Sequence, residues 1–455
     1  MREILIRAAV LLAATPGAFA AQVSDRSSDP GQALLDSLVA HAFVTNPRIQ
    51  AARERINAAR ARSASAGLLP DPMLSLGVQN LPVSRDRSGT EAGRSLPEPM
   101  TMKMVGLAQT LPFPGKRGLE RDAARREVES FEAGLIATQR DIVREVRAAY
   151  YELAFLDRSL EIIELHERLL GQLVRTTESR YAVGAGGQAE TLKVRVEAAR
   201  FAEDAVAIVE SRSATLARLN ALLDRASDAA IDDPRLPARI VRAAGDTSAN
   251  RIRFTSAALG ARAADSPLPS LAELQQAAEQ NNADLSAHEA MIRAQAARLE
   301  LAQRQHLPDF DVSVAYGQRN QRPDMVTAMV SVAVPWQKGR KQDSFVREAS
   351  AALAALHAEH RERVNELRAR VAGLYTDVER ARAQLALFVK AILPQGNATL
   401  ISATAGLRVG RADFVTVLES QAMLHDYEIA YFRALTDFAT SIAELEEVVG
   451  KEILP

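Results

Sequence analysis

Two halves of this 455-residue chain repeat the same series of motifs. The string LPD begins at Leu69 and again at Leu307, each time after a segment of helical character and before an alternating one. Two further motif pairs keep the same order: LPFPGKR at Leu111 with VPWQKGRK at Val334, and RYAVGAGGQAETL at Arg180 with GLRVGRADFVTVL at Gly406. Repeated motifs predict repeated structure. Each half is therefore predicted to form a helix, two strands, a long helix, a tip and a closing helix.

The predicted strands carry one apolar face each. Leu74, Leu76 and Val78 alternate with small or polar residues, and the segment from Phe310 to Tyr316 does the same. A period of two is typical of a strand. The four predicted strands cover residues 73–80, 101–111, 309–320 and 324–334. The apolar face points inward in a soluble sandwich and outward in an outer-membrane barrel, and the alternation alone does not choose between them.

Four strands are too few for a barrel that conducts solute, because about eight strands leave an interior that side chains just fill. Each predicted strand is nevertheless about long enough to cross a bilayer when tilted. A conducting barrel therefore requires several copies of the chain. Residues 81–100, between the first two strands, are rich in Pro, Arg, Ser and Gly, which is typical of an exposed loop.

Two helices are predicted to be far longer than those of a globular domain. They cover residues 115–183 and 338–405, and each is about 100 Å long at 1.5 Å per residue. Their apolar residues alternate three- and four-residue steps, which predicts a left-handed coiled coil. Pro394 is expected to bend the second helix locally. Shorter helices complete the pattern: about 34–68, 188–223 and 413–449.

The composition excludes several classes of function. The 56 Lys and Arg balance 57 Asp and Glu, so nothing favours nucleic acid as a partner. The chain has no Cys, which excludes thiolate metal sites, a Cys nucleophile and a lipid anchor on an N-terminal Cys. No catalytic motif stands in its required context, since the GAGGQ string follows a helix and not a strand. The chain is therefore predicted to be no enzyme and to need no cofactor.

The N-terminus predicts export. Arg2 and Arg7 flank the start of an apolar run, and Ala18-Phe19-Ala20 provides small residues where signal peptidase reads. Residues 1–20 are predicted to be a signal peptide, and no later run of about 18 apolar residues indicates a membrane-spanning helix. The first repeat then covers residues 21–223 and the second covers 271–455. Residues 224–270, with several Pro, Asp and Ser, are predicted to be a linker or an equatorial segment.

With these motifs the chain resembles the TolC-type outer-membrane efflux channels. The resemblance rests on the paired turns Val183-Gly184 and Val409-Gly410, on Leu192 and Leu418 after them, and on LPFPGKR. It implies a mainly α-helical fold with a small membrane β-barrel: a homotrimer with twelve strands in outer-membrane lipid and a coiled-coil tunnel in the periplasm of a Gram-negative bacterium. It also implies a periplasmic adaptor and an inner-membrane pump of the RND type as partners.

The resemblance places adaptor docking at the two helical tips. The alternative is that both tips are ordinary turns with no partner. Glycine suits such a reversal, because it adopts backbone conformations that a side chain hinders. The predicted docking residues are Arg180, Tyr181, Val183, Gly184, Leu192, Val409, Gly410 and Leu418.

A pore gate is also implied by the resemblance. Similar channels carry two Asp of the second tip at the tunnel mouth, and Thr416 and Glu419 occupy these positions here. Three Glu419 carboxylates in a trimer would favour cations, unless Glu419 is simply a solvated surface residue. The family's tip lock joins an Asp to a Tyr and an Arg. Glu190 fits the acid, whereas Leu407 and Ala412 replace the other two residues and Arg411 is one residue away from the Arg position.

The cargo is predicted less directly. The LPFPGKR string, with Met102 and Met104 just before it, looks like the heavy-metal branch of the family, and thioethers suit soft ions such as Cu(I). Methionines at strand spacing can instead face lipid or pack. His357 and His360 could share a divalent ion on one helix, unless they lie on an exposed charged face.

Three classes of function remain open from the sequence. The first is the outer-membrane duct of an efflux pump, exporting heavy-metal ions or organic toxicants. The second is a duct of the same fold for type I secretion of a polypeptide. The third is a periplasmic coiled-coil structural protein, which would need no lipid-facing strands.

Overall fold

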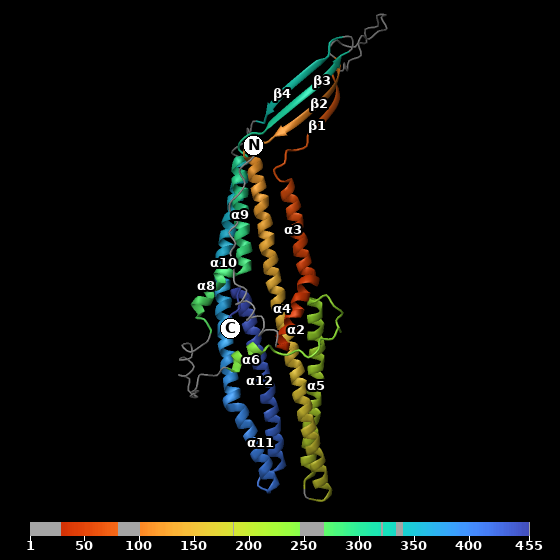
Figure 1. Ribbon diagram of the computed structural model, residues 1–455, viewed down its shortest axis with the longest axis vertical. Helices are drawn as coiled ribbons and strands as arrows, with labels where there is room; N and C mark the ends of the chain where they lie inside the picture. The colour runs from red at the N-terminus through yellow and green to blue at the C-terminus, as the bar shows by residue number, and fades with distance from the viewer. Residues whose placement is uncertain are drawn as a thin grey trace, which may run out of the picture. The chain divides into compact units, whose positions relative to one another are not determined.

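The computed structural model describes residues 29–80, 101–184, 186–245, 268–319, 322–333 and 340–454 (Figure 1). The predicted signal peptide, the predicted loop at residues 81–100 and the VPWQKG string lie outside these ranges. The described residues form two compact units. The hairpin unit takes its residues from within Met1–Gln50, Thr138–Asn282 and Glu366–Pro455, and the sheet unit takes its residues from within Ala51–Ala137 and Ala283–Asn365. Each unit therefore combines both halves of the sequence.

The sheet unit contains one antiparallel sheet of four strands in the order β1-β2-β3-β4 (Figure 1). The strands are β1 (Met73–Gln79), β2 (Met102–Leu111), β3 (Phe310–Arg319) and β4 (Met325–Val332). The two halves meet in the middle, where Gly106 pairs with Ala315. The prediction of a mainly helical protein with a few strands is confirmed, and each strand lies inside its predicted range.

The sheet presents an apolar face to solvent. Leu76 pairs across the sheet with Val105, which pairs with Tyr316, which pairs with Val326, and the exposed fractions of the two outer residues are 74% and 71%. All four side chains of this row are apolar, yet they are exposed and no other part of the described chain covers them. Such a face needs a covering, because contiguous exposed apolar surface marks a site of interaction with protein or membrane.

The motifs that the repeat analysis identified meet at the base of the sheet. Lys116 of LPFPGKR is buried, and its ammonium donates to the Leu307 carbonyl at 2.7 Å and to the Asp309 carboxylate at 2.8 Å. The backbone N–H of Phe113 donates to the same Asp309 oxygen at 2.8 Å. The LPD string of the second half therefore accepts the chain that enters the long helix of the first half. This contact gives a structural role to Lys116 of the first string and to Asp309 of the second.

Two long helices have residues in both units. The first, α4 (Lys116–Ala182), has 67 residues. The second runs from Gln342 to Arg408 and is interrupted by a π-helical turn, so that it comprises α10 (Gln342–Leu387), η2 (Phe388–Ile392) and α11 (Leu393–Arg408). The π turn ends two residues before Pro394, whose ring removes one donor and crowds the carbonyl four residues earlier, at Lys390 inside that turn. A wider turn accommodates that ring, so the disturbance expected at Pro394 takes this form.

One helix expected at residues 34–68 is two helices in the structure. α2 (Pro30–Thr45) ends at Asn46 and α3 (Pro47–Ser65) follows directly. In the second half α8 (Leu271–Asn281) ends at Asn282 and α9 (Ala283–Arg304) follows. The two asparagines are equivalent in the repeat.

These asparagines have the same partner in each half. The Asn46 amide donates to the Leu222 carbonyl at 2.8 Å, and the Asn282 amide donates to the Val448 carbonyl at 3.3 Å. Both carbonyls lie in the last turn of a closing helix, α5 (Gln188–Leu222) or α12 (Phe414–Val449). Carbonyls in the last turn of a helix have no intrahelical donor. The asparagine between the two helices of each half supplies one through its side-chain amide.

Part of the predicted linker is ordered in the hairpin unit. Residues 224–245 include α6 (Ala238–Gly245), whereas residues 246–267 lie outside the described ranges. The buried Tyr150 hydroxyl of α4 accepts from the Arg235 backbone N–H at 3.1 Å and lies 3.1 Å from the Gly31 carbonyl. Tyr150 therefore holds this segment and the start of α2 against α4.

By mean hydropathy, one helix within the described residues is long and apolar enough to cross a membrane. It is the continuous stretch Gln342–Arg408, in which the relevant window has a mean hydropathy of 1.2 and is 17% buried. This window contains polar residues, so it is not the unbroken run of about 18 apolar residues whose absence the sequence analysis noted. A single window of this kind does not by itself indicate a membrane span, because helices of soluble proteins reach the same value.

Candidate functional site

The candidate site consists of two helical tips in the hairpin unit (Figure 1). We define the first tip as the turn from α4 to α5, and the second tip as the turn from α11 to α12. Both turns reverse at a glycine with positive φ: +73° at Gly184 and +71° at Gly410. A Cβ added at either glycine would have open space around it. The backbone conformation, and not crowding, is therefore what requires glycine here.

The first tip is closed mainly by backbone hydrogen bonds. The Gly184 N–H donates to the Tyr181 carbonyl at 3.0 Å. Gly187 occupies the N-cap position of α5 and so offers no capping side chain. A Cβ at Gly186 would lie 3.4 Å from Glu190 Oε2 and 3.7 Å from Arg180 Nε, so these two side chains flank Gly186. The acid predicted for the tip lock thus lies beside residues of its own tip.

The second tip is closed more completely. The Arg411 N–H donates to the Gly406 carbonyl at 2.8 Å, and Asp413 caps α12 by accepting from the Thr416 N–H at 2.9 Å and from its hydroxyl at 2.5 Å. The hydrogen bonds from the Thr416 side chain and backbone hold the pKa of Asp413 below its usual range. This tip therefore has a charged cap that the first tip lacks.

The two hairpins are joined above their tips by an apolar cluster. We call it the tip core; its buried members are Leu170, Val194, Phe201, Phe414 and Leu418, with Leu173, Val174 and Leu407 packed against them. Phe414 is 1% exposed although it is the first residue of α12. The cluster takes residues from α4, α5, α11 and α12, so it fixes the two hairpins of the unit to each other.

The predicted docking residues divide into exposed and buried ones. Tyr181, Val183, Leu192 and Val409 expose large apolar side chains, and Val183 is 76% exposed. Leu418 is 6% exposed, because it belongs to the tip core. Leu192 and Leu418 are equivalent in the repeat and both were predicted to dock. Only Leu192, whose exposed fraction is 52%, is accessible to a partner.

The predicted gate residues do not form a lock within one chain. Glu419 and Arg411 are exposed, and Glu190 is half-buried. Among the described residues no ion pair joins Glu190 to Arg411, although Arg195 and Glu178 pair across the first hairpin at 2.6 Å. A gate formed by these groups would require contacts between chains.

Sequence reasoning missed a buried histidine cluster above the tip core. His166 of α4 lies 2.9 Å from a Glu428 carboxylate oxygen through Nε2 and 2.7 Å from the Gln421 amide through Nδ1. The His425 ring packs edge-on against Phe201, with the centroids 4.3 Å apart, and against His166 at 4.9 Å. Burial, reinforced by His166, lowers the pKa of His425 to about 4. The His425 ring is therefore uncharged at neutral pH.

A signal for this cluster exists in the sequence. His166 continues the three- and four-residue steps of the apolar seam between Ile163 and Leu170. A histidine at a seam position is predicted to be buried, as the structure shows, because the seam faces the neighbouring helix.

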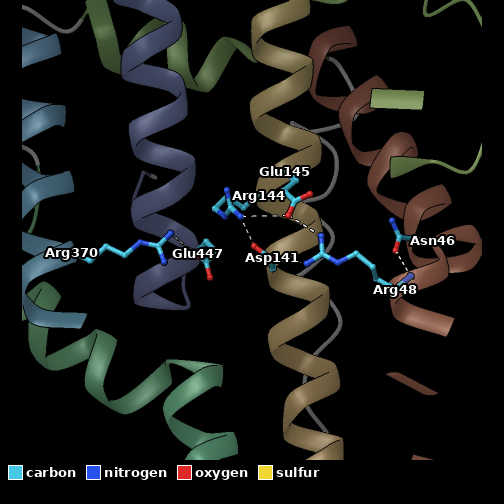
Figure 2. Close-up of polar contacts among 7 residues, drawn as sticks. All are labelled: Asn46, Arg48, Asp141, Arg144, Glu145, Arg370 and Glu447. Carbon is cyan, nitrogen blue, oxygen red and sulfur yellow. Dashed lines mark hydrogen bonds and ion pairs between the residues drawn. The ribbon is translucent and has the colours of Figure 1, made fainter. Parts of the chain in front are cut away.

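Charged groups fasten the start of α3 to α4 farther from the tips (Figure 2). Arg48 contacts Asp141 at 2.5 Å and Glu145 at 2.9 Å, and Arg144 also pairs with Asp141. Burial raises the pKa of Asp141, but the hydrogen bonds from Arg144 and Arg48 outweigh it and leave the pKa below its usual range. These pairs are part of the scaffold of the hairpin unit.

The helical metal candidates are not arranged as a site. His357 is exposed, whereas the His360 ring stacks on His288 with centroids 5.8 Å apart. The His288 ring nitrogen lies 3.0 Å from the Leu356 carbonyl. Within the described residues no group of three or more His, Cys, Asp or Glu could hold a metal ion.

The strand candidates lie on the sheet. Met102 is buried and Met104 is half-buried, and both lie on the face opposite to the apolar one, since Val105 between them belongs to the apolar row. These two methionines therefore do not share a face with the Leu and Val side chains of the sheet.

Known proteins resemble this chain over most of its length. The family described as "Outer membrane efflux protein" matches residues 38–225 and 274–451. Outer membrane protein TolC of Vibrio cholerae serotype O1 is 22% identical over 348 residues, which cover 72% of each chain.

Solved structures share the fold. The outer-membrane channel OprN matches with a TM-score of 0.73 at 17% identity, covering 93% of this chain and 91% of that one. VceC of Vibrio cholerae matches with a TM-score of 0.71 at 20% identity, covering 94% and 98%. CusC, which forms a transmembrane channel, matches with a TM-score of 0.71 at 14% identity, covering 92% of each chain.

Proposed function

Because the chain belongs to the outer membrane efflux protein family, we propose that it is the outer-membrane duct of a tripartite efflux pump. Three copies form a twelve-stranded barrel in the outer membrane and a helical tunnel in the periplasm. The tips dock onto a periplasmic adaptor, which links the duct to an inner-membrane pump of the RND type. A signal peptide at residues 1–20 directs the export of the chain to this location.

The observation that carries this proposal is the open, one-sided apolar sheet. β1 and β4 are edge strands with unpaired backbone groups on their outer sides, and such edges aggregate unless they are covered or paired. Pairing β4 of one copy with β1 of the next removes both edges, and three copies close into a barrel. The apolar face then turns to lipid and the small or polar face lines the lumen, as in membrane barrels.

Docking on the adaptor uses the exposed apolar residues of the tips. Tyr181, Val183, Leu192 and Val409 offer apolar area that water otherwise contacts, and burial of such area drives association. A Val183→Asp, Val409→Asp double variant should lose adaptor capture in cross-linking or co-purification. Val206→Asp, on the equally exposed flank of α5, should retain it. Equal capture by both variants would contradict docking at the tips.

The gate is proposed at Glu419 of the second tip. In a trimer three exposed carboxylates surround the tunnel mouth and favour cations over anions. Single-channel recordings should show a lower cation preference for Glu419→Gln than for the wild type. Unchanged selectivity would exclude Glu419 as the selecting group.

The proposed cargo is heavy-metal ions. Its test is the growth of a deletion strain, with and without the restored gene, on copper, silver, zinc, cobalt and cadmium salts beside dyes and antibiotics. Sensitivity to metals alone supports the proposal. Sensitivity to organic compounds alone would make the chain a multidrug duct of the same fold, and unchanged growth with loss of a secreted polypeptide would make it a secretion duct.

A further inference from the structure

Every methionine of the described strands lies on one face of the sheet. The strand register pairs Met73 with Ala108, Ala108 with Ser313, and Ser313 with Met329, so the first and last residues of this row share a face. The complete set on this face is Met73, Met102, Met104, Met325 and Met329. Five of the nine methionines of the chain are thus gathered on one side of four short strands.

Hydrophobic packing does not explain this segregation. The apolar face of the same described strands is made of Leu, Val, Phe, Tyr and Ala with a few polar residues and has no Met. The methionine face has no Leu, Val, Ile or Phe, and its other residues are Ser, Thr, Gly, Ala, Gln, Asp and Arg. If this face only needed apolar volume, branched aliphatic residues would serve as they do opposite, so the thioether is the feature that distinguishes Met here.

One row of this face alternates glycine and methionine. Gly77 pairs with Met104, Met104 pairs with Gly317, and Gly317 pairs with Met325. Glycine leaves the space above the strand empty, so long side chains on both sides can lean over it. Met102, one row away, already does so: its sulfur would lie only 2.7 Å from a Cβ added at Gly317.

Three methionines therefore lie around Gly317. Met104 and Met325 are its neighbours in register on the two adjacent strands, and the Met102 sulfur occupies the space where a side chain of Gly317 would be. Met102 is 8% exposed, whereas Met325 is 40% exposed, so the group is supported from within the sheet and open on its other side. An ion could enter from that open side without a rearrangement of the strands.

We propose that Met102, Met104 and Met325 form a transient binding site for a soft monovalent ion, Cu(I) or Ag(I), around Gly317. Thioether sulfur prefers such ions, whereas divalent Zn, Co and Cd are better bound by imidazole, carboxylate or thiolate groups, which this row lacks among its described residues. The inference rests on the proposed function for one step, namely that this face lines the lumen through which the cargo leaves. It narrows the cargo from heavy metals to soft monovalent ions.

Binding is tested on the purified full chain in detergent. Ag(I), which needs no reductant, is the probe; bound silver is measured by elemental analysis after equilibrium dialysis in a buffer without chloride or thiols. We expect about one Ag(I) per chain in the wild type and a drop in affinity of at least tenfold in Met104→Leu, Met325→Leu. Met-to-Leu exchange conserves volume, so the fold is retained.

Matched controls separate the site from methionine content. Met73→Leu, Met329→Leu changes the same number of thioethers on the same face, two rows from Gly317 by register, and should leave Ag(I) affinity within about twofold. Met291→Leu, Met423→Leu does the same on helices. Equal loss in all three double variants, or no loss in any, would overturn the proposal.

A second variant keeps all the sulfur atoms. Gly317→Ala adds a methyl group where the Met102 sulfur lies, so it should weaken Ag(I) binding without removing a ligand. Wild-type Ag(I) affinity in Gly317→Ala would contradict a site centred on Gly317. Circular dichroism and trimer migration on native gels show whether either variant is folded.

Growth assays distinguish this inference from the proposed function. Restoring the deletion strain with Met104→Leu, Met325→Leu should leave tolerance to zinc and cobalt unchanged and reduce tolerance to silver and copper. If the deletion has no phenotype while the purified chain binds Ag(I) through these methionines, the efflux proposal fails and the site stands. If the deletion is sensitive to silver while the variant binds Ag(I) as the wild type does, the duct stands and the site fails.

Discussion

The two helical tips share a turn but differ in how they are held. Both reverse at a glycine with φ near +70°, and both follow a long helix with a valine before the glycine. The first tip begins its return helix with Gly187 and the exposed Gln188, whereas the second begins with the capping Asp413 and the buried Phe414. The second tip therefore enters the tip core at the first residue of α12, whereas α5 first contributes to this core at Val194.

This difference suggests a division of labour between the tips. Leu192 of the first tip is exposed while its repeat equivalent Leu418 is buried. A duct needs one element that holds its helices together and another that can meet a partner. The repeated tip motif provides both elements. Its leucine is buried in the tip core at Leu418 and stays exposed at Leu192.

The largest expected effect is the loss of the aromatic anchor. Phe414→Ala should destabilise the hairpin unit by about 3–5 kcal/mol, because it removes a fully buried ring and leaves a cavity. The equivalent change in the first tip, Gln188→Ala, should stay within about 0.5 kcal/mol. Urea unfolding followed by native-state hydrogen exchange of α5 and α12 measures both. Similar losses in the two variants would show that the tips are equally anchored.

Acid should loosen the contact between the hairpins at His425. Its pKa is about 4 when folded and 6.5 when unfolded, so below pH 6.5 the unfolded chain binds more protons and stability falls as the pH falls toward 4. For a pKa lowered from 6.5 to about 4, this loss of stability amounts to about 2–3 kcal/mol. Stability measured from pH 7.5 to 4.5 should therefore decline less steeply in His425→Gln than in the wild type.

His41→Gln, at an exposed position of α2, is the control and should keep the wild-type slope. If His425→Gln also keeps that slope, burial of this ring does not set the acid response. The comparison of α12 with α5 in the same samples shows whether the second hairpin is the more acid-sensitive one.

The shared glycine turn predicts equal effects in the two tips. Gly184→Ala and Gly410→Ala should each cost about 1 kcal/mol, because a Cβ is strained at positive φ even where space is open. Hydrogen exchange of the last turns of α4 and α11 measures these costs. Gly171→Ala, inside α4, is the matched control and should stabilise slightly. A clearly larger cost in one tip would mean that the turns are not equivalent.

The smallest effect is expected from exchange of the caps. Asp413→Gly should lower, and Gly187→Asp should raise, the protection of the first turn that follows by less than about twofold, since glycine is itself a tolerated N-cap. The contribution of Asp413 is present above pH about 3.8 and is lost as the pH falls through its lowered folded pKa. An effect of Asp413→Gly that persists in full at pH 3 would exclude the carboxylate as its source.

Several features of the fold followed from local patterns. The strand alternation from Leu74 and from Phe310 placed β1 and β3, because a period of two is a property of the strand itself, and the repeat placed β2 and β4. The glycines of the turns were identifiable for a similar reason, since positive φ selects glycine whatever surrounds it. The methionine face could also have been predicted from the sequence. Met73 and Met325 are at odd-numbered positions, whereas the apolar residues of the same strands are at even-numbered ones, so the two sets lie on opposite faces.

Other features escaped sequence reasoning because they depend on distant residues. Asn46 and Asn282 sit in otherwise helical segments, and their effect requires the carbonyls of Leu222 and Val448. The burial of His425 requires Phe201 of another helix. The residues near Asn46, Asn282 and His425 in the sequence do not indicate which distant residues they contact.

The sequence by itself determined the repeat, the element types, the faces of the strands and the position of both tips, since each arises from a few neighbouring residues. Only the tertiary structure decided that Leu418 is buried while Leu192 is exposed, and that Met102 leans over Gly317. Periodicity shows which residues share a face. It does not show which face a distant helix or strand will cover, and that packing decides burial.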